Sequence, residues 1–133
     1  MSKKRYVIVG TGGRHSLFRD AIVGTHAQHC ELVAFCDNNE GRMRLSNAQI
    51  ASKGHPEVPL YGEADFDEMV AEVKPDIVVV TTRDSFHDTY IVRAMELGCD
   101  VVTEKPMTID EERCQRIVDV QKRTGRDIRV TFN

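Results

Sequence analysis

Apolar residues in this chain gather into six short runs, separated by longer segments in which they recur at helical spacing. The runs, which we predict to be strands, cover residues 6–10, 32–37, 59–61, 76–82, 100–104 and 127–132. Several runs are continuously apolar instead of alternating with polar residues, a pattern typical of strands buried on both faces of a parallel sheet. The intervening segments must then supply the helices that cover those faces.

One segment between the runs has the apolar stripe of an amphipathic helix, at positions i, i+3, i+4 and i+7: Phe66, Met69, Val70 and Val73. Asp65 and Glu68 are spaced as a capping box at the start of this helix, and Pro75 ends it. Residues 41–52 predict a weaker helix, because the apolar residues there do not form one clean stripe.

The alternation of strands and helices predicts crossover connections and a doubly wound parallel sheet. We therefore expect an α/β fold of the Rossmann type with about six strands. The length of 133 residues suits a single domain with one core, covering residues 1–133. The chain stops directly after its last predicted strand, so we expect a truncated domain or a fragment of a longer protein.

Composition and charge argue against several classes of function. The formal net charge of −3 gives no reason to expect a nucleic-acid surface. No apolar run approaches the roughly 20 residues needed to span a bilayer. The N-terminus lacks the features of a signal peptide, so we predict a cytoplasmic protein. The 4 cysteines show no C-x-x-C spacing, and we expect free thiols and no metal site.

A glycine-rich turn follows the first predicted strand, in the order Gly10, Thr11, Gly12, Gly13, Arg14 and His15. Gly10 permits a tight turn, and Gly12 lets the backbone approach a pyrophosphate, toward which a helix opening near Gly13 directs its unpaired N–H groups. His15 stands where G-x-G-x-x-G has its third glycine, so either the motif is weakened or Gly13 shares that task. The His15 side chain either covers the pyrophosphate or only fills surface space.

An acidic residue, Asp37, ends the second predicted strand. A carboxylate there can accept both ribose hydroxyls of the adenosine half of a dinucleotide and repel a 2′-phosphate, which favours NAD over NADP. Asn38 follows in the same turn. Arg42 keeps NADP open as the cofactor, because a nearby arginine can reach a 2′-phosphate. The alternative role for Asp37 is that of a helix N-cap.

Two motifs at the ends of the fourth and fifth predicted strands carry a resemblance to a known family. Residues 78–87 read VVVTTRDSFH, and residues 94–106 read AMELGCDVVTEKP. The chain resembles, over essentially its whole length, the N-terminal domains of the Gfo/Idh/MocA family (glucose–fructose oxidoreductase, inositol dehydrogenase and rhizopine catabolism). The placement of E-K-P is the most specific part of the resemblance. Arg83 departs from the family pattern, which usually has a proline after Thr82.

The resemblance implies an oxidoreductase that transfers a hydride between a nicotinamide cofactor and a sugar, inositol or related polyol. It implies a catalytic role for Lys105, which would contact the nicotinamide ribose and aid proton transfer at the substrate hydroxyl. The other positions that match cofactor-binding residues of the family are Thr81, Thr82, His87, Glu104 and Asn133. Glu104 could orient Lys105. The alternatives are a surface lysine paired with Glu104, and a His87 that only packs or caps a helix.

In this family the substrate pocket and further catalytic groups lie on a C-terminal domain, which is absent from this chain. We therefore expect the chain to bind NAD or NADP without turning over substrate, and to self-associate through an apolar patch that the missing domain normally covers. Two other classes remain open. An NAD-dependent glycoside hydrolase of the same family would copurify with its cofactor in stoichiometric amount. A non-catalytic nucleotide-binding module would not require a lysine at position 105.

Overall fold

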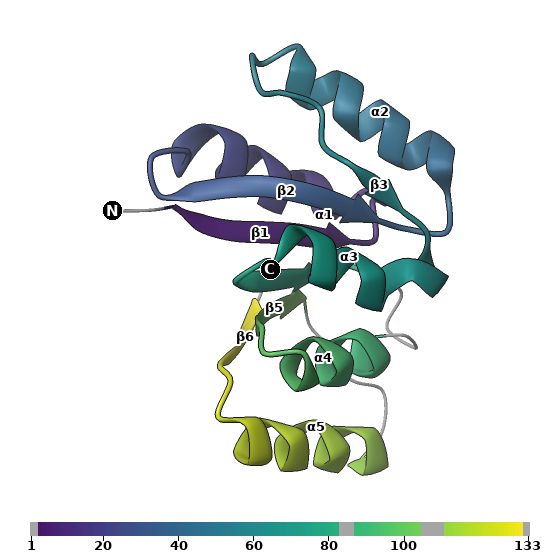
Figure 1. Cartoon of the computed structure of the whole chain (residues 1–133), viewed down its shortest axis with the longest axis vertical. Helices are drawn as coiled ribbons and strands as arrows, with labels where there is room; N and C mark the ends of the chain where they lie inside the picture. The colour runs from purple at the N-terminus through teal and green to yellow at the C-terminus, as the bar shows by residue number, and fades with distance from the viewer. Residues whose placement is uncertain (1–2, 83–86, 105–110, 132–133) are drawn as a thin grey trace.

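A computed structural model of the chain describes residues 3–82, 87–104 and 111–131, and omits the side chains of residues 87 and 131 (Figure 1). Its centre is a sheet of six parallel strands in the order β3-β2-β1-β4-β5-β6. The strands are β1 (Lys4–Val9), β2 (Cys30–Cys36), β3 (Leu60–Tyr61), β4 (Ile77–Val80), β5 (Asp100–Glu104) and β6 (Ile128–Thr131). The predicted Rossmann-type α/β fold is therefore confirmed.

Helices cover both faces of the sheet (Figure 1). They are α1 (His15–Asp20), which continues as a π-helical turn (Ala21–Thr25), α2 (Glu40–Ala51), α3 (Phe66–Val73), α4 (His87–Glu96) and α5 (Glu111–Thr124). α1 and α2 pack on one face, whereas α3, α4 and α5 pack on the other. The strands serve both layers because their side chains alternate: Val7 and Val9 join the core under α3 and α4, while Ile8 points to the core under α1 and α2.

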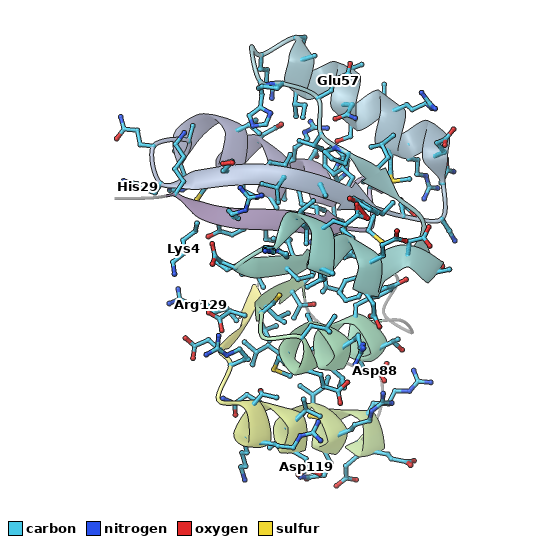
Figure 2. The ribbon with its side chains drawn as sticks, viewed as in Figure 1. Lys4, His29, Glu57, Asp88, Asp119 and Arg129 are labelled. Atoms are coloured by element: carbon cyan, nitrogen blue, oxygen red, sulfur yellow. The ribbon has the colours of Figure 1, made fainter. Side chains whose placement is uncertain are left out.

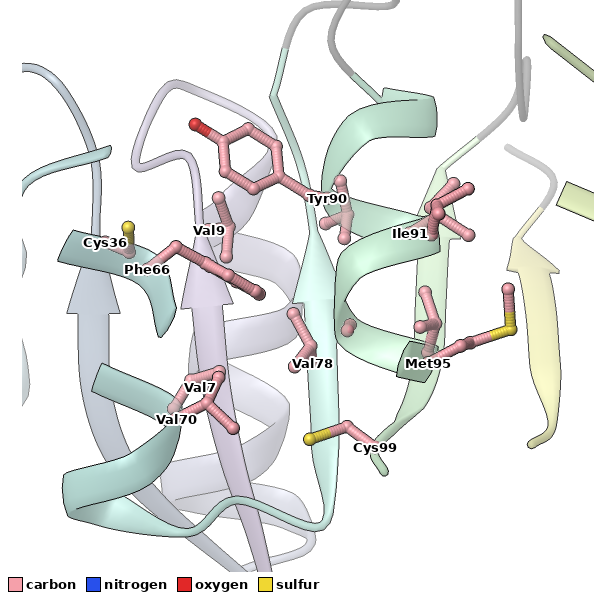
Figure 3. Packing of buried hydrophobic residues seen from close by; sticks show 14 of the residues in the cluster. Val7, Val9, Cys36, Phe66, Val70, Val78, Tyr90, Ile91, Met95 and Cys99 are labelled. Atoms are coloured by element: carbon pink, nitrogen blue, oxygen red, sulfur yellow. The ribbon is translucent and has the colours of Figure 1, made fainter. Parts of the chain in front are cut away.

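The core on the α3–α4 side is the larger of the two (Figure 3). Phe66 from α3 and Tyr90 from α4 meet above the strands with their ring centroids 5.4 Å apart. Val78, Ile91 and Met95 fill the space between β4 and α4, each at most 1% exposed. Continuously apolar strands thus reflect burial on both faces, as the sequence pattern predicts.

The start of one helix and the start of one strand differ from the sequence predictions. Asp65 occupies the N-cap position of α3, but its side chain makes no capping hydrogen bond, so the predicted capping box does not form. The reason is a short 3-10 turn (Glu63–Asp65) that runs directly into the helix and gives Asp65 a φ of −102° and a ψ of 18°, away from the extended conformation of an N-cap. The third strand is also shorter than predicted, since pairing begins at Leu60.

The weak stripe predicted for residues 41–52 has a structural explanation. The face of α2 that is turned inward consists of Met43, Ser46, Asn47 and Ile50, at helical spacing. Asn47 is tolerated there because its amide nitrogen donates to the carbonyl of Val58 and its amide oxygen accepts from the N–H of Val58, both at 2.9 Å. The buried face of α2 is therefore half polar, so the pattern of apolar residues alone does not reveal it.

An apolar hollow of about 440 Å³ lies beside α1, over β4 and β5. Phe18 and Ile22 from the α1 segment line it together with Val79 and Val102 from the strands, and Leu17 at its edge is 59% exposed. In the part of the chain that the structure describes, no helix is long and apolar enough to cross a membrane.

Candidate cofactor-binding site

The site predicted from the sequence lies where the strand order reverses. β2 and β3 extend the sheet on one side of β1, and β4, β5 and β6 extend it on the other. The chain segments that leave β1 and β4 therefore diverge at the carboxyl edge of the sheet. In doubly wound sheets this switch point is where ligands bind. The glycine turn, the end of β2 and the turn after β4 all meet there.

Gly10 packs directly against the turn that follows β4. Its φ is +92°, and a Cβ added to it would lie 2.8 Å from backbone atoms of Thr81 and Thr82. The Thr81 hydroxyl donates to the Gly10 carbonyl at 2.6 Å. Only glycine fits this position, both for its conformation and for the close approach of two backbones.

Gly12 and Gly13 form the open part of the turn. A Cβ at Gly13 would meet nothing within 4 Å, and a Cβ at Gly12 would meet only the Arg42 guanidinium, at 4.0 Å. Helix α1 itself begins at His15, two residues later than the sequence suggests, with Arg14 at its N-cap position. The backbone of the turn is therefore accessible to a bulky ligand, with the Arg42 cation beside it.

His15 lies below the glycine turn instead of on the surface, so its interpretation as a surface-filling residue is wrong. Its side chain is buried, with Nδ1 against the carbonyl oxygen of Gly12 and Nε2 2.8 Å from the Ser46 hydroxyl of α2. Arg19, also buried, donates to the same hydroxyl at 3.1 Å. Burial lowers the pKa of His15. The imidazole thus ties the turn to α1 and α2 where other sequences have a third glycine.

Asp37 is turned toward the glycine turn. Its Oδ2 accepts from the backbone N–H of Thr11 at 2.8 Å and from the Thr11 hydroxyl at 2.5 Å, and its Oδ1 accepts from the Asn38 N–H at 2.6 Å. The side chain does not cap α2, because Asn39 does so by accepting from the N–H of Arg42. The alternative role of Asp37 as a helix N-cap is therefore wrong.

A cavity of about 290 Å³ opens over these groups and is lined by Gly10, Thr11, Gly12, Asp37, Asn38, Arg42, Glu63, Thr81 and Thr82. Glu63 is the one lining residue that sequence reasoning missed. No local signal could have found it, because its position depends on the pairing of β3 with β2. The other eight residues were all predicted from the glycine turn, the acid after β2 and the family motifs.

The far end of the site is at the end of β5. The Arg14 Nε, from the glycine turn, lies 2.9 Å from Glu104 Oε1; the arginine side chain is 60% exposed and the glutamate side chain only 11%. This ion pair joins two segments 90 residues apart. Lys105 and Asn133 lie outside the described residues, and so does the side chain of His87, the first residue of α4.

The described residues form no metal centre, and their thiols are free. Within residues 3–82, 87–104 and 111–131, no group of three or more His, Cys, Asp or Glu residues is placed to hold a metal ion. All 4 cysteines are free, with Cys36 and Cys99 buried. Both lie in the core under α3 and α4, in agreement with the expectation of buried free thiols.

The parallel sheet with strand order 321456 and a glycine turn at its switch point define a nucleotide-binding domain of the Rossmann class. The sequence matches the oxidoreductase family with an NAD-binding Rossmann fold, Gfo/Idh/MocA, over residues 4–132. The chain therefore belongs to this family, as its strand-end motifs indicate.

Several relatives illustrate the range of the family. The chain is 31% identical over 131 residues to YteT of Bacillus subtilis (strain 168), covering 98% of this chain and 30% of YteT. It is 32% identical over 103 residues to D-glucoside 3-dehydrogenase of Escherichia coli (strain K12), covering 77% of this chain and 27% of that enzyme. It is 30% identical over 128 residues to glycosyl hydrolase family 109 protein 1 of Akkermansia muciniphila, covering 93% and 26%.

A solved structure agrees with these sequence matches. The WlbA dehydrogenase of Bordetella pertussis, crystallised with NADH and UDP-GlcNAcA, superposes with a TM-score of 0.82 at 25% identity, over 98% of this chain and 37% of that one. The chain thus spans between 26% and 37% of the length of these relatives.

Proposed function

We propose that this chain is the cofactor-binding domain of an oxidoreductase that transfers a hydride between NAD and a secondary alcohol of a sugar, inositol or related polyol. The observation that carries the proposal is the cavity at the switch point. There a buried carboxylate, Asp37, faces the open glycine turn in a chain of the Gfo/Idh/MocA family. Relatives named as a glucoside dehydrogenase and as an NADH-bound sugar-nucleotide dehydrogenase support the substrate class.

The residues of the cavity fit the adenosine and pyrophosphate parts of a dinucleotide. Gly12 and Gly13 leave their backbone open to a pyrophosphate, and the Arg42 guanidinium beside them would neutralise its charge. Asp37 and Asn38 stand where the adenosine ribose would lie. A cavity of about 290 Å³ suits this half of the molecule.

At the nicotinamide end, the family pattern supplies the roles. When bound, the cofactor would take up or release the hydride. Lys105 would hold the substrate hydroxyl and move its proton, and Glu104 would lie beside it, with its charge balanced by Arg14. The proposed contacts to the nicotinamide half are completed by Thr81, Thr82, His87 and Asn133. His15 would act on the cofactor through the turn that it supports.

The sharpest test is calorimetry of NAD and NADP on the chain itself. We expect NAD to bind at least tenfold more tightly than NADP, a difference of about 1.4 kcal/mol. The reverse preference would assign the discrimination to Arg42 instead of Asp37. Absence of binding by either dinucleotide would contradict the cofactor assignment for this chain. Because the chain covers only about 30% of the length of these relatives, we expect it to bind the dinucleotide without turning over any polyol.

A hydrolase that uses tightly bound NAD is the second candidate, and the match to a glycosyl hydrolase family 109 protein favours it. The two can be separated by denaturing freshly purified protein and measuring released NAD. Stoichiometric NAD would support the hydrolase, whereas cofactor-free protein that binds added NAD reversibly would support the dehydrogenase. A non-catalytic binding module is the third candidate, in which NAD binding would depend on Asp37. Replacement of the lysine that corresponds to Lys105 would then leave the activity of a full-length homologue unchanged.

We also propose that the protein is cytoplasmic and that it self-associates. The apolar hollow beside α1 is the basis for the proposed self-association. Leu17 at the edge of the hollow and Leu45 on α2 offer a matched pair, since they are 59% and 60% exposed. Leu17→Glu should shift the protein toward monomer in sedimentation velocity, and Leu45→Glu should not. Equal behaviour of the two variants would exclude the hollow as the contact.

A further inference from the structure

The Asp37 carboxylate is nearly saturated by the protein itself. A carboxylate has about four lone-pair positions for hydrogen bonds, and three of them are used by the Thr11 N–H, the Thr11 hydroxyl and the Asn38 N–H. One position remains for a ligand. A ribose with two hydroxyl groups therefore needs a second acceptor beside Asp37.

Glu63 lines the same cavity, and its segment is held against the end of β2. The N–H of Asp37 donates to the carbonyl of Tyr61 at 3.1 Å, and the Cys36 thiol reaches the carbonyl of Gly62 at 3.4 Å. The 3-10 turn that starts at Glu63 is closed by a bond from the N–H of Asp65 to the same Gly62 carbonyl. Glu63 is therefore placed by backbone contacts on both sides.

Glu63 also lines a second hollow, on the side of α3 and α4, together with Phe66 and Tyr90. Tyr90 is buried between α3 and α4, and it lines this hollow with Glu63. Figure 3 shows its hydroxyl pointing to the carboxyl end of the strands, beside Val9. Burial, and then the charge of Glu63, raise the pKa of Tyr90. Glu63 therefore lies at the rim between this hollow and the cavity that Asp37 lines.

The charge at this end of the site is negative, and it affects the pKa of the Cys36 thiol. Burial, followed by the carboxylates of Glu63, Asp37 and Asp65, raises the pKa of Cys36 to about 12. Arg42 is the cation among the described lining residues of the cavity, against the two carboxylates of Asp37 and Glu63. A 2′-phosphate would add further negative charge to a site whose acids already outnumber its base.

We propose that Glu63 is a second specificity-determining residue, which accepts the ribose hydroxyl that Asp37 leaves unpaired and repels a 2′-phosphate. The inference rests on the proposed function of the cavity and deepens it. Selection of NAD is then shared by two acids that follow different strands, β2 and β3. Removal of Asp37 alone should not convert the site to NADP.

The test is calorimetric titration of NAD and NADP into the unmodified chain, Glu63→Gln and Glu57→Gln. Both substitutions remove one negative charge from an exposed side chain, but Glu57 lies in the connection between α2 and β3, at the other end of the strand (Figure 2). Glu63→Gln should weaken NAD about threefold and tighten NADP about threefold, so that the NAD preference falls about tenfold. Glu57→Gln should leave the preference unchanged, and Tyr90→Phe should reduce it less than Glu63→Gln does.

The remaining outcomes contradict either the role of Glu63 alone or the cofactor assignment on which it rests. If the unmodified chain prefers NAD and Glu63→Gln keeps the same preference as Glu57→Gln, the role of Glu63 is wrong while the cofactor assignment stands. If both variants change the preference equally, the effect is one of net charge and the role of Glu63 is again wrong. If the unmodified chain binds neither dinucleotide, the proposed function fails and this inference fails with it.

Discussion

The two ends of the proposed cofactor site are built differently. At the adenosine end, Asp37 is buried, and hydrogen bonds of 2.5–3.1 Å connect it to Thr11 of the glycine turn and to Tyr61 of β3. At the nicotinamide end, Arg14 and Glu104 form an ion pair whose arginine is largely exposed. One end relies on backbone groups packed against each other, and the other on long side chains.

This difference suggests a division of labour. Backbone and buried groups hold one geometry at little cost in conformational entropy. The adenosine end is therefore preorganised to discriminate between NAD and NADP. An ion pair with one exposed partner contributes little to stability and can rearrange, so the nicotinamide end can adjust to the cofactor and to a substrate. The predictions below test this contrast, beginning with the largest expected effect.

Gly10→Ala should destabilise the whole fold, because it breaks the junction between the two ends. The new Cβ would lie 2.8 Å from the backbone of Thr81 and Thr82, at a φ of +92°. We expect the free energy of unfolding in urea to fall by at least ~3 kcal/mol. Gly54→Ala has a similar φ of +88° with open space around it, and should cost only about 1–2 kcal/mol. Equal losses would mean that backbone strain, and not the close approach, dominates at Gly10.

Asp37→Ala should weaken the binding of NAD at the adenosine end. The substitution removes the carboxylate that faces the cavity and leaves the N–H of Thr11 without its acceptor. NAD should bind at least tenfold more weakly by calorimetry, a loss of about 1.4 kcal/mol or more. Asp119→Ala, on the outer surface of α5, is the control and should bind NAD like the unmodified chain (Figure 2). Unchanged NAD affinity in Asp37→Ala would remove the ribose from this position.

His15 should make the stability of the adenosine end depend on pH. Its pKa is lowered in the folded state by burial, so below the unfolded value of about 6.5 the unfolded chain binds more protons than the folded chain. The free energy of unfolding should therefore fall as the pH drops from about 7 to about 5. His15→Gln should flatten this slope in urea titrations at several pH values, and His55→Gln should not. Parallel slopes in all three proteins would assign the pH dependence elsewhere.

Arg14→Gln should have the smallest effect, because an ion pair with one exposed partner contributes at most about 1 kcal/mol to stability. A double-mutant cycle with Glu104→Gln measures this coupling free energy. Calorimetry with NAD and with ADP-ribose, which lacks the nicotinamide, locates the pair: only the affinity for NAD should change. A matching loss of ADP-ribose affinity would show that the pair serves the adenosine end too, contrary to the proposed division.

The sequence predicts much of the site because local patterns carry it. Gly10 stands directly after an apolar strand, and Asp37 ends the next one, so both can be placed at the carboxyl edge without knowing the fold in detail. Ser46 and Asn47 could not be recognised as inward-facing, because their hydrogen-bond partners come from other parts of the chain and the local sequence does not indicate them. His15 is a similar case: its burial depends on Ser46, 31 residues away.

What the sequence alone determined are the six strands, the helices between them, the Rossmann class and the family, because periodicity, turn residues and short motifs are properties of neighbouring positions. The tertiary structure decided which side chains share the cavity. Glu63 joins Asp37 only because β3 pairs with the end of β2. Arg14 meets Glu104 only because β5 lies two strands from β1. Such contacts depend on the order of strands in space, and the linear pattern of the chain does not contain it.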